Sequence, residues 1–343
     1  GMDTLTNPFR GTGLDIEGVP ATARPSTDAD APAGLLARCP AHAETPLADA
    51  RALAAELGLA ALHLKDERGR MGLGSFKALG AAYAIARDAA QIPGERPLAG
   101  RTYVAASAGN HGLSLAAGAR VFGASAVIYL AETVPESFAE RLREKGARVV
   151  REGATYEESM AAAASDALRE DWVLLSDSSW PGYLDLPRRV MEGYLEMAAE
   201  AARQVPEPPT HILLQAGVGG MAAAVAAHAR AVWGDAPDIA VVEPEAAPAL
   251  RDSIREGRAV RAEGPVSAMG RLDCKEPSIL ALSGLARDAD RFVAISEPEA
   301  AAAVDRLAAH GLATTPSGAA GVAPLLDTVA RESLGIGAEA HVL

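Results

Sequence analysis

Short apolar segments alternate with segments of helical spacing along most of the chain, and this alternation constrains the fold more than any other feature. Strands that are separated by helices form a mostly parallel sheet with helices on both faces. We therefore predict an α/β fold, built from open, twisted, mostly parallel sheets covered by helices on both faces. Strands are predicted at residues 61–65, 102–106, 126–130, 147–151, 172–175, 211–215, 239–242 and 292–295.

Helices are predicted in the segments between these strands. One spans residues 75–87 with Ser75 as its N-cap, and a long amphipathic helix spans residues 185–203. Residues 1 to about 50 are rich in Pro, Ala and Asp, so we predict an irregular arm with a turn and a helix start at residues 45–47. The last helix is predicted after Ser317, with Ser317 as its N-cap.

The charge balance and the cysteines limit the partners and the compartment. The 343 residues carry a formal net charge of −13, which argues against a nucleic-acid backbone or an anionic membrane surface. No run of about 18 apolar residues is present, and no signal-peptide pattern is visible. Cys39 and Cys274 fit a reducing compartment and lack metal-site spacing. We predict a cytoplasmic protein that binds no metal.

Lysine is scarce, because only four of the 32 basic residues are lysines. A lysine ammonium can lose its proton and act as a nucleophile, whereas the arginine guanidinium stays charged. Lys77 follows a glycine-containing loop and lies at the start of a predicted helix, where the helix dipole disfavours the protonated amine. Lys77 is therefore a candidate Schiff-base former. The alternative is an exposed helix lysine.

Two other predicted strands end in loops that open helices. The loop 107–112 offers backbone N–H groups with the side chains of Ser107 and Asn110, which suits a carboxylate or a simple helix cap. The loop 217–221 can bind a phosphate through main-chain donors. With Ala222 this loop also fits the dinucleotide pattern G-x-G-x-x-A, with Glu243 as the acidic residue that ends the next strand. A tight turn is a third interpretation.

Two single residues complete the candidate chemistry. Asp177 ends a predicted strand, so it is a candidate general base, with a loop-capping carboxylate as the alternative. Ser317 lies at a helix start, where its hydroxyl could also contact a ligand ring.

The order of these motifs resembles the fold-type II pyridoxal-phosphate enzymes, the tryptophan synthase β-like family, from about residue 45 to about residue 326. Within that family the chain is most similar to the diaminopropionate ammonia-lyases. The stretches that carry this similarity are 65–70 with Gly72 and Leu73, 76–80, 177–183, and 270–277 with Cys274 and Glu276.

The resemblance implies a pyridoxal 5'-phosphate site. Lys77 would link covalently to the cofactor and later move protons. Asn110 would hydrogen-bond the ring hydroxyl, Ser317 would meet the pyridine nitrogen, and Phe76 would pack near the ring. The phosphate would be bound by the backbone amides of Gly217, Val218, Gly219, Gly220 and Met221.

The resemblance also implies elimination of ammonia from a 2,3-diamino acid, giving pyruvate and ammonia. Ser107, Gly109 and His111 would form the loop that binds the substrate carboxylate. Lys77 or Asp177 would take the Cα proton, and in the lyases the carboxylate matching Asp177 serves the L-isomer. Ala108 replaces an Asp that the lyases associate with the D-isomer, so we predict an L-preferring enzyme or a different substrate.

The family further implies two domains with the cofactor between them, and a homodimer. We expect a large domain from residues 1–87 and 181–343 and a small inserted domain from residues 88–180. Two alternative functions remain. One is an L-threonine or L-serine dehydratase-like enzyme with the same cofactor, and the other is a dinucleotide-binding oxidoreductase.

Overall fold

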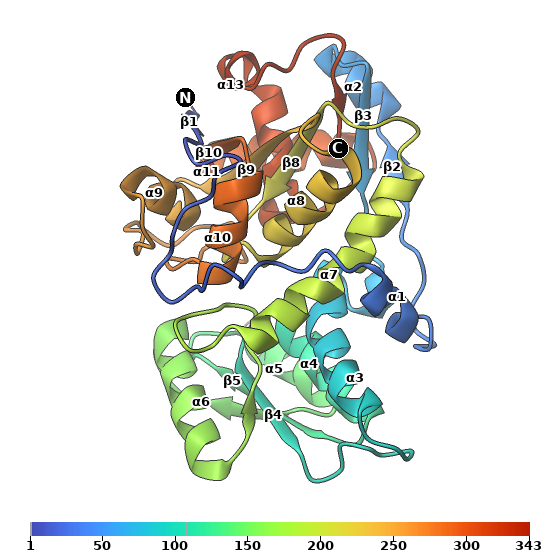
Figure 1. Ribbon diagram of the computed structural model, residues 1–343, viewed down its shortest axis with the longest axis vertical. Coiled ribbons are helices and arrows are strands. Elements are labelled where there is room, and N and C mark those ends of the chain that lie inside the picture. The colour runs from blue at the N-terminus through green and yellow to red at the C-terminus, as the bar shows by residue number, and fades with distance from the viewer. Residues whose placement is uncertain (1, 108) are drawn as a thin grey trace.

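The chain forms two β-sheets (Figure 1), and the computed structural model describes residues 2–107 and 109–343. The larger sheet has seven strands in the order β1-β10-β9-β8-β11-β3-β2. Its interior strands pair in parallel, whereas the edge strands β1 and β2 pair antiparallel with β10 and β3. The strands are β1 Asp3–Thr6, β2 Leu47–Asp49, β3 Ala61–Lys65, β8 His211–Gln215, β9 Asp238–Pro244, β10 Arg291–Ile295 and β11 His341–Val342.

The smaller sheet has four parallel strands in the order β6-β5-β4-β7. Alternate residues of its central strands enter two separate apolar clusters, because successive side chains point to opposite faces. Helix α6 (Tyr156–Glu170) covers one face, and α3 (Gly80–Ala90), α4 (Asn110–Val121) and α5 (Glu136–Glu144) contribute to the other. The strands are β4 Thr102–Ala106, β5 Ser125–Leu130, β6 Arg148–Arg151 and β7 Val173–Leu174.

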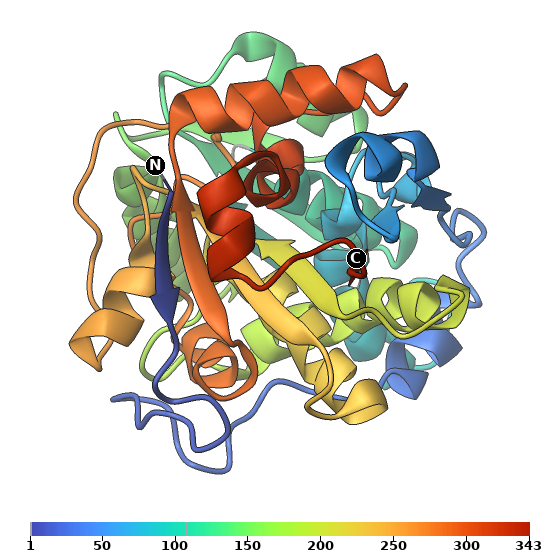
Figure 2. The ribbon, with the colours of Figure 1, turned by 90° about the horizontal axis from the view of Figure 1, so that it is seen from above.

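Helices also cover both faces of the larger sheet (Figure 2). One face packs against α11 (Glu297–Ala309) and the short helix η3 (Ala320–Leu326), and the other packs against α8 (Gly220–Trp233) and α10 (Ile279–Asp288). Helix α7 (Asp185–Gln204) packs against both α8 and α3, so it joins the two halves of the molecule. The remaining helices are α1 Asp30–Leu36, α2 Arg51–Leu57, η1 Arg70–Gly72, η2 Phe76–Leu79, α9 Ala249–Glu256, α12 Pro316–Ala319 and α13 Thr328–Ser333.

The predicted α/β fold is confirmed, and every predicted strand is found to within about two residues. The prediction of an irregular N-terminal arm is wrong in three places, since β1, α1 and β2 all lie within residues 1 to about 50. The helix start predicted at residues 45–47 is also wrong, because β2 occupies Leu47–Asp49 and α2 begins at Arg51. Both edge strands are short, and their pairing with β10 and β3 supplies a stability that the sequence of each short strand does not show.

All four strands of the smaller sheet lie between residues 102 and 174, and all strands of the larger sheet lie outside that range. The division into domains at residues 87 and 180 stays a proposal. Among the described residues, no helix is both long enough and apolar enough to span a membrane.

Candidate active site

Lys77 lies in the short helix η2, directly after the loop that leaves β3. The Oγ of Ser75 accepts a hydrogen bond from the Lys77 backbone N–H at 3.2 Å, so the predicted N-cap is confirmed. The Lys77 Nζ donates to the Oδ2 of Asp177 at 2.6 Å. The structure therefore brings together Lys77 and Asp177, the two candidate residues for proton transfer from the sequence.

Asp177 lies in a loop that is fixed on both sides of the carboxylate. The hydroxyl of Tyr183 donates to the carbonyl of Leu174 at 2.7 Å and accepts from the N–H of Ser176 at 2.9 Å. The ring of Tyr183 also stacks on Trp180, with the ring centroids 4.3 Å apart. These contacts hold the end of β7 and the following turn in one conformation.

Burial and mutual attraction act in opposite directions on this ion pair. Burial lowers the pKa of Lys77, but the charge and hydrogen bond of Asp177 together with other neighbouring groups outweigh burial, and the net pKa lies above the usual value. Burial likewise raises the pKa of Asp177, and the charge of Lys77 brings it well below the usual range. Both groups are therefore charged at neutral pH, and a proton can pass between them over 2.6 Å.

His111 is buried on α4 and supports the same loop. Its Nε2 lies 2.8 Å from the carbonyl oxygen of Leu175, which can only accept, so this nitrogen carries the hydrogen. The Nδ1 has no hydrogen-bond partner among the described residues. Burial lowers the pKa of His111 and leaves the ring neutral. Its predicted contact with a substrate carboxylate stays a prediction.

The loop that opens α4 contains the other predicted ligand-binding residues. The Oγ of Ser107 accepts from the N–H groups of Gly109 at 3.2 Å and Gly112 at 3.0 Å, so this hydroxyl stabilises the helix start. Asn110 is buried at that start. Ala108 lies outside the described residues, and the prediction attached to it stays a prediction.

The loop 217–221 joins β8 to α8 and forms a narrow cradle. A Cβ on Gly217 would lie 2.8 Å from the Arg271 carbonyl oxygen and 3.0 Å from the Cys274 Sγ. Gly219 has a φ of +102°, a left-handed conformation that favours glycine. The first N–H groups of a helix have no partner within the helix, so this loop is suited to an anion such as phosphate. Its predicted residues Val218, Gly220 and Met221 complete the turn into α8.

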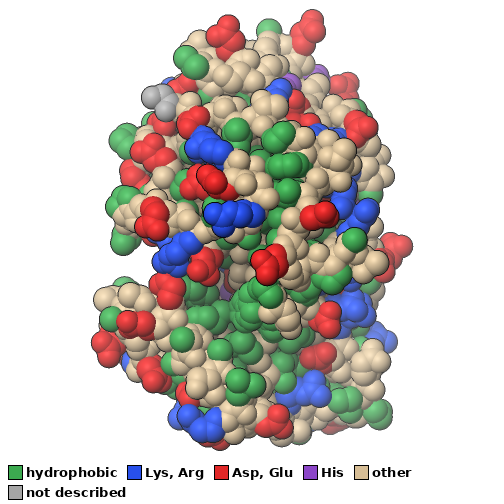
Figure 3. All heavy atoms as spheres, turned by 60° about the vertical axis from the view of Figure 1, so that its left-hand side comes forward, with side chains coloured by type: hydrophobic (Ala, Val, Ile, Leu, Met, Phe, Trp, Pro, Cys, Tyr) green, Lys and Arg blue, Asp and Glu red, His purple; other side chains and the backbone are tan. Residues whose placement is uncertain are grey.

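The cradle lies beside the ion pair. A Cβ on Gly220 would lie 3.9 Å from the backbone oxygen of Asp177. The backbone N–H of Arg271 donates to the Oγ of Ser317 at 3.2 Å, which places Ser317 next to the segment that covers Gly217. The predicted cofactor residues therefore converge on one region, and the surface is hollowed between the two halves of the molecule on the face in Figure 3.

Two details of the prediction are wrong. Ser317 does not cap the helix at this point, α12, because the Oγ1 of Thr315 accepts from the Gly318 N–H at 3.1 Å and Pro316 fills the first helical position. The acidic residue of the dinucleotide pattern, Glu243, is fully buried and accepts from the backbone N–H groups of Leu250 and Arg251. It therefore caps α9 and is not free to bind a ribose, which removes the support for a dinucleotide site.

Two tyrosines belong to the site and were missed. Tyr194 on α7 is 2% exposed and packs edge-on against Phe76, with ring centroids 5.1 Å apart. Tyr156 begins α6 on the smaller sheet and is 47% exposed, and the atoms crowded around its phenol, with the negative charge of Asp177, raise the pKa of that phenol. Tyr194 has the helical spacing of an ordinary core residue, and Tyr156 follows an ordinary N-cap, so neither carries a local signal.

Comparison with known proteins decides the family. A family model described as pyridoxal-phosphate dependent enzyme matches residues 39–343. The chain belongs to the pyridoxal-phosphate dependent enzymes. The family cofactor, pyridoxal 5'-phosphate, fits the residues present, because the glycine cradle admits no side chain at Gly217 and the adjacent Lys77 supplies an amine.

Within this family, the chain is similar to individual diaminopropionate ammonia-lyases. The chain is 33% identical to a diaminopropionate ammonia-lyase of Salmonella typhimurium over 71% of this chain and 66% of the relative. It is 32% identical to the diaminopropionate ammonia-lyase of Escherichia coli K12 over 75% of this chain and 69% of the relative. The solved Escherichia coli enzyme in complex with an aminoacrylate-PLP azomethine reaction intermediate superposes with a TM-score of 0.89 at 27% identity, covering 100% of this chain and 92% of that chain.

Proposed function

We propose that this enzyme is an ammonia-lyase that eliminates ammonia from a 2,3-diamino acid, with L-2,3-diaminopropionate as the model substrate, and releases pyruvate and ammonia. The observation that carries the proposal is the 2.6 Å contact between the Nζ of Lys77 and the Oδ2 of Asp177. The similarity to diaminopropionate ammonia-lyases over most of the chain supports the substrate class.

Different residues of the site would bind different parts of the cofactor. Lys77 would hold pyridoxal 5'-phosphate covalently, the backbone of residues 217–221 would hold its phosphate, and Asn110 and Ser317 would contact its ring. When bound, the cofactor delocalises the negative charge that develops at the substrate Cα. The loop 107–111 would hold the substrate carboxylate at the start of α4.

Asp177 is placed to accept the Cα proton. The charge of Lys77 holds the pKa of Asp177 low, while burial acts to raise it. When the Lys77 amine is neutralised, its lowering effect on the pKa of Asp177 is lost while burial still raises that pKa, so the proton affinity of Asp177 increases. A carboxylate with raised proton affinity is suited to general-base catalysis near neutral pH.

A substrate panel tests this proposal. We expect the holoenzyme to form pyruvate from L-2,3-diaminopropionate faster than from the D-isomer, L-serine or L-threonine, with two ammonia molecules released per pyruvate. Lys77→Ala sets the background. Absence of pyruvate above that background would refute the proposal, and faster turnover of L-threonine or L-serine would favour the dehydratase-like alternative.

We also propose that the enzyme is a cytoplasmic homodimer with a small amino acid as its substrate and two domains that enclose the cofactor. Light scattering after size-exclusion chromatography tests the dimer. A mass of one chain at micromolar concentration would contradict it. Limited proteolysis tests the domain boundaries at residues 87 and 180.

A further inference from the structure

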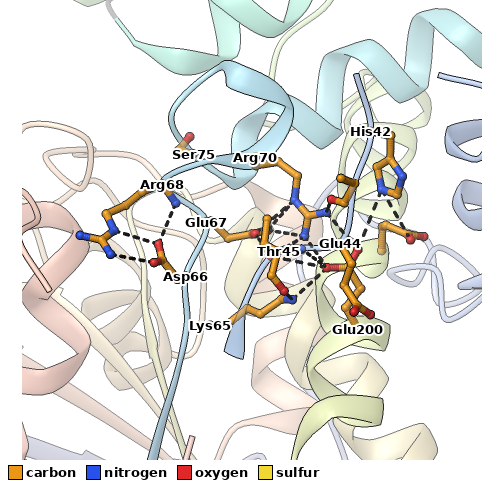
Figure 4. A network of polar contacts seen from close by, with 12 residues as sticks. His42, Glu44, Thr45, Lys65, Asp66, Glu67, Arg68, Arg70, Ser75 and Glu200 are labelled. Carbon is orange, nitrogen blue, oxygen red and sulfur yellow. Dashed lines mark hydrogen bonds and ion pairs between the residues drawn. The ribbon is translucent and has the colours of Figure 1, made fainter. Parts of the chain in front are cut away.

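A buried network of charges surrounds Arg70, which begins the short helix η1 on the approach to Lys77 (Figure 4). The Arg70 side chain is 0% exposed. Its guanidinium donates two hydrogen bonds to Glu200, at 2.8 and 3.0 Å, and at 2.9 Å to the Oε1 of Glu67. It also donates to the Ala43 carbonyl oxygen and to the Thr45 Oγ1, each at 3.0 Å.

A second cation, Lys65, completes the network. Its Nζ donates to the Glu200 Oε1 at 2.8 Å, to the Gln204 Oε1 at 2.8 Å and to the Thr45 carbonyl oxygen at 2.7 Å. Two cations therefore face two carboxylates. Burial raises the pKa of Glu200, but its hydrogen bonds to Arg70 and Lys65 outweigh this and bring the pKa to about 2. The Glu200 carboxylate is therefore ionised at neutral pH.

The network ties Arg70, the first residue of the segment 70–80, to helix α7, because Glu200 lies on α7. The same helix holds the other end of that segment. A Cβ on Gly193 would lie 2.4 Å from the Leu79 carbonyl oxygen, and a Cβ on Gly80 would lie 2.8 Å from the Tyr194 ring. Lys77 lies between these two attachments.

Two further features make the attachment at Arg70 consequential. The next residue, Met71, has a φ of +51°, a left-handed conformation that costs energy for a residue with a side chain. Helix α7 also follows directly on the loop of Asp177, so it is connected to both partners of the ion pair. A fixed segment 70–80 and a fixed α7 together determine where the Lys77 amine lies relative to Asp177.

We propose that Arg70 is a positioning residue for Lys77. Through its paired hydrogen bonds to Glu200 it locks the segment 70–80 onto α7 and aligns the Lys77 Nζ with Asp177 and with the cofactor. A lysine cannot replace it, because an ammonium lacks the planar fork that binds two oxygens of one carboxylate. The inference rests on the cofactor and on the chain's own contacts, and it does not depend on which amino acid is the substrate.

The test compares Arg70→Lys and Glu200→Gln with the matched control Arg87→Lys. Arg87 on α3 also pairs with a glutamate of α7, since its Nη1 lies 3.1 Å from the Glu192 Oε1, but it lies beyond the segment 70–80. We expect kcat per bound cofactor to fall about 10- to 100-fold in the two network variants, with KM changed little, because small misplacements of reacting groups have effects of that size. We expect Arg87→Lys to retain the wild-type kcat per bound cofactor.

A second readout needs no substrate. The circular dichroism of the bound cofactor in the visible region reports its fixed orientation, and we expect a loss of this signal per bound cofactor in Arg70→Lys and Glu200→Gln. If both variants keep the wild-type signal and kcat per bound cofactor while their melting temperature falls, the network is merely structural and the proposal is overturned. An equal loss in Arg87→Lys would also overturn it.

Poor folding of both network variants does not prevent a decision. Thr45→Ala removes one hydroxyl from the network and leaves all four charges in place, so it is the mildest perturbation. We expect a smaller loss in the same direction in both readouts. Unchanged visible circular dichroism and unchanged kcat per bound cofactor in Thr45→Ala, if the other variants do not fold, would overturn the proposal.

Discussion

Replacement of Asp177 by Asn removes the carboxylate that the Lys77 amine contacts and changes the side-chain volume little. Two opposite effects are expected. Uptake of pyridoxal 5'-phosphate by the apoenzyme requires a neutral Lys77, and the charge of Asp177 opposes its neutralisation. Uptake should therefore become easier in Asp177→Asn. Turnover of the L-isomer should fall, because the variant lacks the proposed base.

The size of the first effect follows from the geometry. Two unit charges 2.6 Å apart interact by roughly 6 kcal/mol at an effective dielectric constant of about 20. That energy corresponds to roughly four to five pKa units. The side chains are 21% and 15% exposed, and solvent reduces the effect, so we expect the pKa of Lys77 to fall by at least about two units. Loss of general-base catalysis costs about 10²- to 10⁴-fold in kcat.

The assay follows the visible absorbance of the apoenzyme after addition of pyridoxal 5'-phosphate, as a function of pH. Uptake by Asp177→Asn should reach its maximal rate at a pH at least about two units below wild type. Asp273→Asn is the control, because it breaks another Lys–Asp pair at 2.6 Å, with Lys275, and leaves Lys77 untouched. An unshifted uptake profile in Asp177→Asn, or an equal shift in Asp273→Asn, would refute the reasoning.

Three other substitutions give separate tests. Gly217→Ala should weaken cofactor retention by at least about 10-fold in equilibrium dialysis, since its Cβ would lie 2.8 Å from the Arg271 carbonyl oxygen. Gly193→Ala should lower the free energy of unfolding by about 1–3 kcal/mol in urea, because its Cβ would lie 2.4 Å from the Leu79 carbonyl oxygen. The pKa of Glu200 is lowered from 4.5 to about 2, so its stabilisation is present above pH 4.5 and is lost as the pH falls toward 2. This amounts to about 3 kcal/mol, and Glu200→Gln should flatten the dependence of unfolding free energy on pH in that window.

The parts of the site that the sequence predicts are those with a local signal. Ser75 and Lys77 mark a helix start after a strand, and the structure has Ser75 as the cap and Lys77 in the first turn. The glycine loop at 217–221 is recognisable because its close approach to the backbone of residue 271 requires glycine. Each of these signals arises within a few residues of the chain.

The parts that the sequence does not predict depend on distant contacts. Tyr194 and Glu200 occupy positions on an amphipathic helix where spacing predicts only burial, and their partners lie more than 100 residues earlier in the chain. The two-residue strand β11 becomes recognisable only between β8 and β3. Ser317 and Thr315 both satisfy the sequence rule for a helix cap, and only the three-dimensional structure shows that Thr315 caps α12.

The scarcity of lysine gains a physical reason from the hydrogen bonds that each ammonium makes. Lys65 donates three hydrogen bonds, and Lys275 donates three as well, to two carbonyl oxygens and to Asp273. Three donors are all that an ammonium has, so the hydrogen-bonding capacity of both amines is saturated. Among the described residues Lys77 donates one side-chain hydrogen bond, to Asp177, and keeps two donors free. A planar guanidinium could neither direct three donors from one nitrogen nor lose its proton, and of these three lysines Lys77 alone keeps donors free.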